Sequence, residues 1–102
     1  MIEIRFSPDA LEDLQEIKSY ITDDLQNEIA AEKTLKTIMD RIKQLMDFPD
    51  MGAPLSSVAE TESDYRYLIC ESYTAFYRHE EDTVYIIRVL YGRRDYMRML
   101  FE

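Results

Sequence analysis

The hydrophobic period of this chain changes near its middle, and this change restricts the fold more than any other feature. Two stretches have apolar residues at spacings of three and four, which is typical of amphipathic helices. These residues are Leu11, Leu14, Ile17, Ile21 and Leu25 in the first stretch, and Ala31, Leu35, Ile38, Ile42 and Leu45 in the second. Three aromatic and β-branched runs follow and predict strands: YRYLIC (65–70), YTAFYR (73–78) and TVYIIRVLYG (83–92).

The segments between these runs indicate how the elements connect. IEIRF (2–6) alternates apolar and charged residues, which predicts a short first strand. The following Ser-Pro-Asp (7–9) offers an N-cap, a proline at the first helical position and an early acid, so a helix is expected to begin there. FPDMGAPL (48–55) is a turn-rich connector that continues into a polar loop, SSVAETES (56–63).

Together these patterns predict an α+β fold of order β-α-α-β-β-β, in which a helical hairpin packs on one face of a small antiparallel sheet. At 102 residues the chain forms a single domain, residues 1–102. Charged residues of the first helix are expected on its solvent side: Glu12, Asp13, Glu16, Lys18 and Asp23.

Charge is distributed unevenly along the chain. The formal net charge is -9, and residues 1–64 carry 15 acidic and 6 basic side chains, whereas residues 65–102 carry 6 of each. This excess of acid argues against general affinity for nucleic acid, which depends on neutralising phosphates. The six cations of the second part are all arginines, and their planar donor groups suit bidentate recognition of carboxylate or phosphate.

Most catalytic chemistries lack the residues they need. The single histidine, His79, falls in the predicted turn HEED (79–82), where exposure to solvent is expected. The single cysteine, Cys70, ends an apolar strand and is expected to be a buried, unreactive thiol without a disulfide partner. We therefore expect no metal site and no cofactor. No secretion signal or membrane span is visible, and the cytoplasm is the expected location.

Four motifs resemble a known family when they are taken in order: P-x-M-G-x-P-L (49–55), Y-R-x-L (65–68), Y-x-x-F-Y-R (73–78) and R-V-L-x-G-R-R-D (88–95). With the preceding helical hairpin, the chain resembles the RelE/ParE superfamily of toxins from bacterial type II toxin-antitoxin modules over essentially its whole length. The resemblance implies the fold derived above and a cognate antitoxin as partner. It leaves a homodimer open.

The superfamily has two known activities, and particular positions of this chain match or depart from the branch that has each activity. In the branch that cleaves mRNA on the ribosome, Arg66 and Arg94 would match basic active-site residues. Two other positions depart from that branch: Thr74 stands where one group has arginine, and Leu100 stands where the tail has tyrosine.

The tail instead resembles the ParE-like branch, whose characterised members poison DNA gyrase without known catalytic residues. We therefore expect a toxin that acts on a protein target. Candidate residues for binding this target or the antitoxin are Arg78, Arg93, Arg94, Tyr96 and Arg98. In the alternative in which this tail is only structural, Leu100 and Phe101 would cover the core. Two alternatives stay open, a ribosome-dependent mRNA endonuclease and a non-toxic peptide-binding module.

Overall fold

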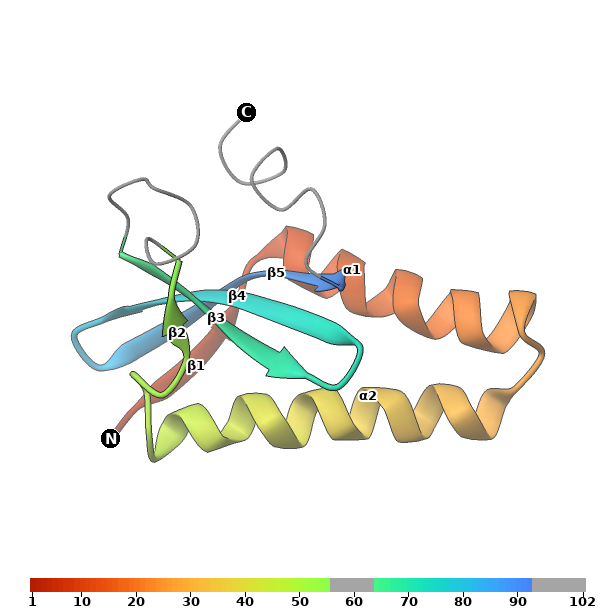
Figure 1. Ribbon diagram of the computed structural model, residues 1–102, viewed down its shortest axis with the longest axis horizontal. Coiled ribbons are helices and arrows are strands. Elements are labelled where there is room, and N and C mark those ends of the chain that lie inside the picture. The colour runs from red at the N-terminus through yellow and green to blue at the C-terminus, as the bar shows by residue number, and fades with distance from the viewer. Residues whose placement is uncertain (56–63, 93–102) are drawn as a thin grey trace.

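The computed structural model describes residues 1–55 and 64–92 of the chain (Figure 1). The predicted helices and strands are present, and a two-residue strand adds to them. The elements are β1 (Glu3–Phe6), α1 (Pro8–Ser19), the π-helical turn η1 (Tyr20–Asp24), α2 (Glu28–Lys43), the 3-10 turn η2 (Gln44–Met46), β2 (Ala53–Pro54), β3 (Tyr65–Cys70), β4 (Tyr73–Glu80) and β5 (Thr83–Tyr91).

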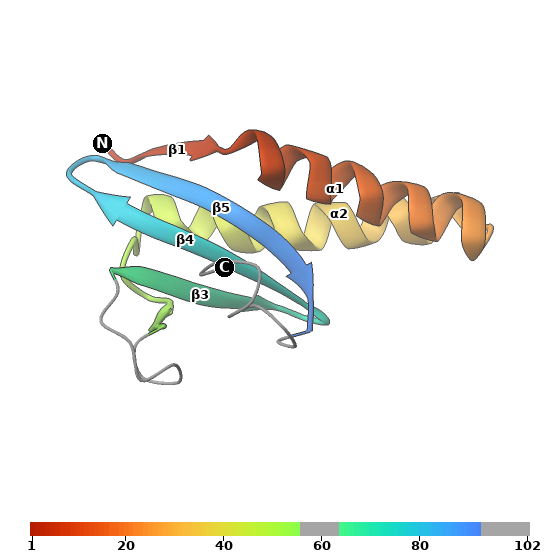
Figure 2. The same cartoon turned by 90° about the horizontal axis from the view of Figure 1, so that it is seen from above.

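The strands form one sheet in the order β1-β5-β4-β3-β2. The three strands β3, β4 and β5 are antiparallel, as predicted, and the additional strand β2 is antiparallel to β3. The prediction of an antiparallel sheet is wrong at β1, which runs parallel to β5, so the sheet is mixed. No tight turn joins β1 to β5, because the whole hairpin and the meander lie between them, and their direction is therefore not restricted to antiparallel. Figure 2 shows β1 beside β5 at one edge of the sheet. The predicted α+β class, with a helical hairpin on a sheet, is confirmed.

The core lies between the hairpin and the sheet. Helical residues in it include Ala10, Ile17, Ala31, Ile38 and Ile42, and strand residues include Leu68, Ala75, Tyr77, Val84 and Ile86. The predicted stripe of α1 is wrong at both ends, because Leu11 and Leu25 are more than half exposed while Ala10 is fully buried. Within the described ranges, no helix combines the length and apolar character that crossing a membrane requires.

Where β1 ends, the start of helix α1 forms hydrogen bonds with the edge of β5. The backbone N–H of Ser7 donates to the carbonyl of Ile86 (2.9 Å), and the Ser7 hydroxyl donates to the carbonyl of Ile87 (2.7 Å). The same hydroxyl accepts a hydrogen bond from the N–H of Ala10 (3.0 Å) and so caps the helix. The predicted N-cap therefore also satisfies part of an otherwise open strand edge.

Asp13 continues this contact nearly two turns further along α1. Its Oδ2 accepts from the N–H of Val89 (2.9 Å) and from Nε of Arg88 (2.8 Å), while its Oδ1 accepts from Nη2 of Arg88 (2.8 Å). The expectation that Asp13 faces solvent is wrong, because its side chain is buried against β5. The local sequence pattern does not indicate this contact, since the partners on β5 lie 75 and 76 positions later in the chain. The hydrogen bond that Arg88 donates to Asp13 raises the pKa of the Arg88 guanidinium, which therefore stays charged.

We predict that Asp13→Ala destabilises the fold by on the order of 3 kcal/mol, because it leaves the Arg88 guanidinium and the Val89 amide without their acceptor in a partly buried place. Chemical denaturation monitored by circular dichroism measures the loss. The matched control is Asp40→Ala, which removes an exposed i,i+4 pair with Lys36. A denaturation midpoint that moves equally in both variants would contradict the assignment.

Candidate functional site

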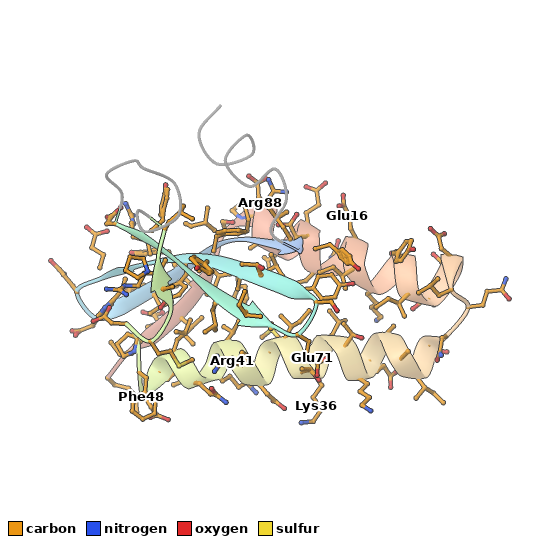
Figure 3. All side chains as sticks on the ribbon, viewed as in Figure 1. Glu16, Lys36, Arg41, Phe48, Glu71 and Arg88 are labelled. Carbon is orange, nitrogen blue, oxygen red and sulfur yellow. The ribbon has the colours of Figure 1, made fainter. Side chains whose placement is uncertain are left out.

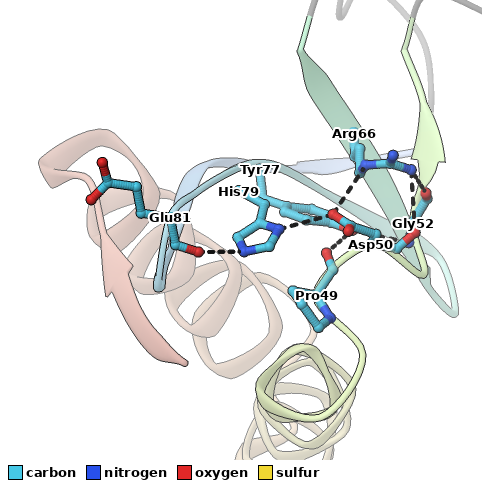
Figure 4. Close-up of polar contacts among 7 residues, drawn as sticks. All are labelled: Pro49, Asp50, Gly52, Arg66, Tyr77, His79 and Glu81. Atoms are coloured by element: carbon cyan, nitrogen blue, oxygen red, sulfur yellow. Dashed lines mark hydrogen bonds and ion pairs between the residues drawn. The ribbon is translucent and has the colours of Figure 1, made fainter. Parts of the chain in front are cut away.

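A buried tyrosine holds the loop that precedes β2 (Figure 4). The Tyr77 hydroxyl donates to the carbonyl of Pro49 (2.8 Å) and accepts from the N–H of Gly52 (2.9 Å). Gly52 lies so close that an added Cβ would be 2.6 Å from the Tyr77 oxygen and 2.8 Å from the carbonyl of Tyr67. Burial raises the pKa of the Tyr77 phenol, so it stays protonated and able to donate. The P-x-M-G motif is therefore a packing requirement of this loop.

Arg66, the candidate catalytic cation of β3, binds the same loop. Its Nη1 donates to the carbonyls of Gly52 (2.8 Å) and Asp50 (3.2 Å), and its Nε lies 3.7 Å from Oδ1 of Asp50. The side chain is partly covered as a result. The Nη1 donors of Arg66 are thus directed at backbone carbonyls of the loop.

His79 lies in β4 and not in a turn, which corrects the sequence prediction. The strand continues to Glu80, because the turn needs only Glu81 and Asp82, with Glu81 in the left-handed region (φ 54°). Nδ1 of His79 lies 2.9 Å from Oδ1 of Asp50, and Nε2 lies 2.8 Å from the carbonyl of Glu81. The ring is therefore held between Asp50 and the β4–β5 turn.

Arg78 is the predicted binding residue that the structure describes. Its guanidinium carbon lies 5.6 Å from the centre of the Tyr85 ring, and its Nη2 lies 3.2 Å from Oε2 of Glu80. Side chains alternate along a strand, so Arg78 is on the sheet face opposite Tyr77. The structure does not bring Arg78 together with Arg66. Arg93, Arg94, Tyr96 and Arg98 lie outside the described residues, as do Leu100 and Phe101.

Thr74 occupies a position that distinguishes the branches of the superfamily. It is buried, and its hydroxyl donates to the carbonyl of Gly92 (2.7 Å), whose N–H donates to the carbonyl of Ser72 (2.8 Å). Gly92 has φ 66°, which favours glycine, so this contact fixes the direction in which the chain leaves β5. The buried side chain at this position therefore helps to hold the fold.

Cys70 and the acidic residues offer little catalytic chemistry. Cys70 is buried, as predicted, and burial raises its pKa to about 11, which disfavours the reactive thiolate. In residues 1–55 and 64–92, no three side chains of the metal-binding types His, Cys, Asp or Glu gather in one place.

Sequence reasoning missed Asp13, Asp50 and Tyr77. In the sequence, Asp50 lies in the predicted connector 48–55 and Tyr77 in the predicted strand 73–78, and neither pattern indicates their contacts. The proline, glycine and methionine around Asp50 were the available signal, since such a motif indicates a loop with strict packing.

Comparison with known proteins identifies the family. Residues 4–96 match the family described as the ParE toxin of type II toxin-antitoxin systems, parDE. The chain belongs to the ParE toxin family. This match confirms the predicted superfamily and the ParE-like branch within it. A comparison with curated proteins found no match.

Solved structures share the fold of this ParE-family toxin. The chain is similar to a structure of the chromosomal ParDE system from P. aeruginosa, with a TM-score of 0.76, 22% identity and coverage of 91% of this chain and 98% of that chain. It is also similar to the E. coli DinJ-YafQ complex, with a TM-score of 0.58, 14% identity and full coverage of both chains. A structure of YafQ from E. coli strain BL21(DE3) has a TM-score of 0.53 and 17% identity over the full length of both chains.

We predict that Tyr77→Phe destabilises this ParE-family protein by about 1–3 kcal/mol, because the Pro49 carbonyl and the Gly52 amide both lose their partner. Tyr20→Phe, at an exposed tyrosine, is the control and should leave the denaturation midpoint unchanged. Equal stability of Tyr77→Phe and the unmodified protein would show that the hydroxyl does not hold the loop.

We also predict that Cys70 resists alkylation in the folded protein. With a pKa of about 11, roughly one thiol in a thousand is ionised at pH 8, and the sulfur is covered as well. Iodoacetamide labelling followed by mass spectrometry should be slow in buffer, fast in urea, and faster in buffer above about pH 10. Labelling at the same rate in buffer and in urea at pH 8 would refute the burial of this thiol.

Proposed function

We propose that this ParE-family toxin stops growth by binding a protein target, with DNA gyrase as the leading candidate, and that a cognate antitoxin neutralises it. The cytoplasm, where such a target acts, is its proposed location. The family supplies the class of function, and the described side chains support the choice of a protein target over RNA cleavage.

The observation that most favours a protein target over RNA cleavage is the environment of Arg66. An RNA-cleaving site would need cations free to stabilise the charge that develops on the attacked phosphate. Arg66 instead donates to Gly52 and Asp50, and the only histidine of the chain, His79, is held between Asp50 and Glu81. Thr74 replaces a further cation and is buried. These residues support a structural role for the network in Figure 4.

The proposed binding surface consists of arginines and a tyrosine late in the chain: Arg78, Arg93, Arg94, Tyr96 and Arg98. Arginine and tyrosine contribute much of the binding energy in protein interfaces. Support comes from Arg78, which is partly exposed and stacks on Tyr85. We propose that these residues contact the target or the antitoxin.

A direct test distinguishes the proposed function from the alternative, a ribosome-dependent mRNA endonuclease. We predict that inducing the chain alone slows bacterial growth, and that primer extension on transcripts from the induced cells finds no new cuts in phase with codons. The protein encoded by the adjacent reading frame, if co-expressed, should restore growth. Cuts in phase with codons would overturn the choice of target and make Arg66 and Arg94 the leading catalytic cations. Normal growth with abundant folded protein would favour the non-toxic binding module.

A second prediction tests the arginine-rich tail. Replacing both Arg93 and Arg94 with Ala should abolish growth inhibition while the melting temperature stays nearly constant, because surface substitutions usually change stability by about 0.5 kcal/mol or less. The matched control replaces Lys33 and Lys43, two exposed cations of α2, with Ala and should stay toxic. A fully toxic Arg93/Arg94 variant would remove these residues from the interface, and an unfolded one would assign them to the fold.

A further inference from the structure

Strand β1 has an open edge. Among the strands of the described residues, β5 is its neighbour on one side and none lies on the other, and Figure 2 shows β1 at the border of the sheet. The N–H groups of Glu3 and Ser7 donate toward β5, at 2.8 and 2.9 Å. Backbone groups of successive residues in a strand point to opposite sides, so those of Ile2, Ile4 and Phe6 face outward.

The other long strand edges of the described part are covered. Beyond the end of β1, Ser7 and Asp13 bond the edge of β5. At the far side of the sheet, β2 pairs with part of β3, and Nε of Arg41 donates to the carbonyl of Ile69 beyond it (3.1 Å). Figure 3 shows Arg41 on the side of α2 that faces the sheet. Strand β2 has only two residues and contains Pro54, which has no N–H to offer.

The side chains of β1 divide into an apolar face and a charged face. Ile2, Ile4 and Phe6 pack against the core but stay partly exposed. Glu3 and Arg5 lie on the opposite face, where their side chains are 59% and 61% exposed and Nε of Arg5 is 3.2 Å from Oε1 of Glu3. Exposed charges of one sign on an edge strand repel a copy of that strand. These two are opposite in sign and two positions apart, so a copy in the right register complements them.

We propose that β1 pairs with β1 of a second copy of this chain, antiparallel and about a two-fold axis at Ile4. In this register Ile4 faces its own equivalent, Ile2 faces Phe6, and Glu3 faces Arg5 of the other copy. The outward backbone groups of the even-numbered residues then meet one another, so each of their facing pairs exchanges two N–H···O=C hydrogen bonds. The symmetry makes every contact between unlike residues occur twice.

The charges select this register over its neighbours. A shift by two residues keeps the same backbone groups facing, but it puts Glu3 opposite Glu3 or Arg5 opposite Arg5 of the other copy, and like charges that face each other are destabilising. On the apolar face, Ile2, Ile4 and Phe6 of the two copies form one strip, which covers side chains that a single copy leaves partly exposed.

The joint is small, so a weak dimer is expected. Stable complexes bury roughly 1,200–2,000 Å² in total, more than a pairing of residues 2–6 supplies. Each copy also carries a net charge of -9, which opposes approach. At about 0.15 M salt, charges further apart than about 8 Å are largely screened, whereas facing side chains are not, and the measurements belong at that salt. This pairing requires no particular cellular target of the toxin.

Charge exchange on the full chain tests the pairing. In sedimentation velocity the unmodified chain should form a dimer whose fraction rises from low micromolar to near-millimolar concentration. Glu3→Arg makes both charges of β1 positive and Arg5→Glu makes both negative, so each variant alone should dimerise at least about tenfold more weakly. An equimolar mixture of the two variants restores opposite charges at every facing position and should form a mixed dimer. An unmodified chain that stays monomeric, or a mixture that dimerises no better than its parts, would overturn the proposal.

Matched controls separate the register from net charge. Glu32→Arg and Lys33→Glu make the same two charge changes at exposed positions of α2 and should leave the dimer unchanged, alone or mixed. Thermal melting by circular dichroism should give the same midpoint for all four variants, because every position is on the surface. A loss of dimer in the controls equal to that in the β1 variants would assign the association to net charge and contradict the pairing.

Amide hydrogen exchange locates the joint. The outward N–H groups of Ile4 and Phe6 should exchange at least about tenfold more slowly at concentrations where the dimer dominates than where the monomer does. The N–H of Arg5 faces β5 in both states and is the internal control. A dimer in which Ile4 and Phe6 exchange as fast as in the monomer would place the interface elsewhere and refute the pairing of β1.

Discussion

The fold depends on one buried carboxylate. Asp13 accepts three hydrogen bonds, two from Arg88 and one from the amide of Val89, and so joins the first helix to the last strand. Together with Ser7, it occupies the edge of β5 that the short strand β1 leaves open. An open strand edge is a site for unwanted pairing, and a buried carboxylate without partners is costly, so each feature compensates for the other. The contact also fixes where α1 lies against the sheet.

The sequence predicts the elements well because their patterns are local. Hydrophobic spacing located both helices, and the Ser-Pro-Asp signal located the start of α1. The errors come from contacts between distant residues. Asp13 has the character of a surface residue until Arg88 is placed beside it, and the parallel pairing of β1 requires knowing where β5 lies. Leu25 follows the helical stripe in sequence, but η1 changes the period just before it.

The candidate site was less predictable, for a similar reason. The sequence identifies Arg66 as a cation on a strand, but its role depends on the carbonyls of Asp50 and Gly52, which approach it only because Tyr77 holds their loop. The same geometry connects His79 to Asp50. A set of arginine, histidine and aspartate can thus serve structure as well as chemistry, and the direction of its hydrogen bonds separates the two. The proposed roles of Arg93 and Arg94 stay predictions.

The most direct test of the central claim uses purified components. The chain should be mixed with purified DNA gyrase, ATP and relaxed plasmid, and the supercoiled product measured as a function of toxin concentration. We expect that supercoiling falls or that cleaved DNA accumulates. Full gyrase activity at all toxin concentrations, together with cleavage of mRNA by the same preparation on translating ribosomes, would contradict the account and assign the chain to the RNA-cleaving activity.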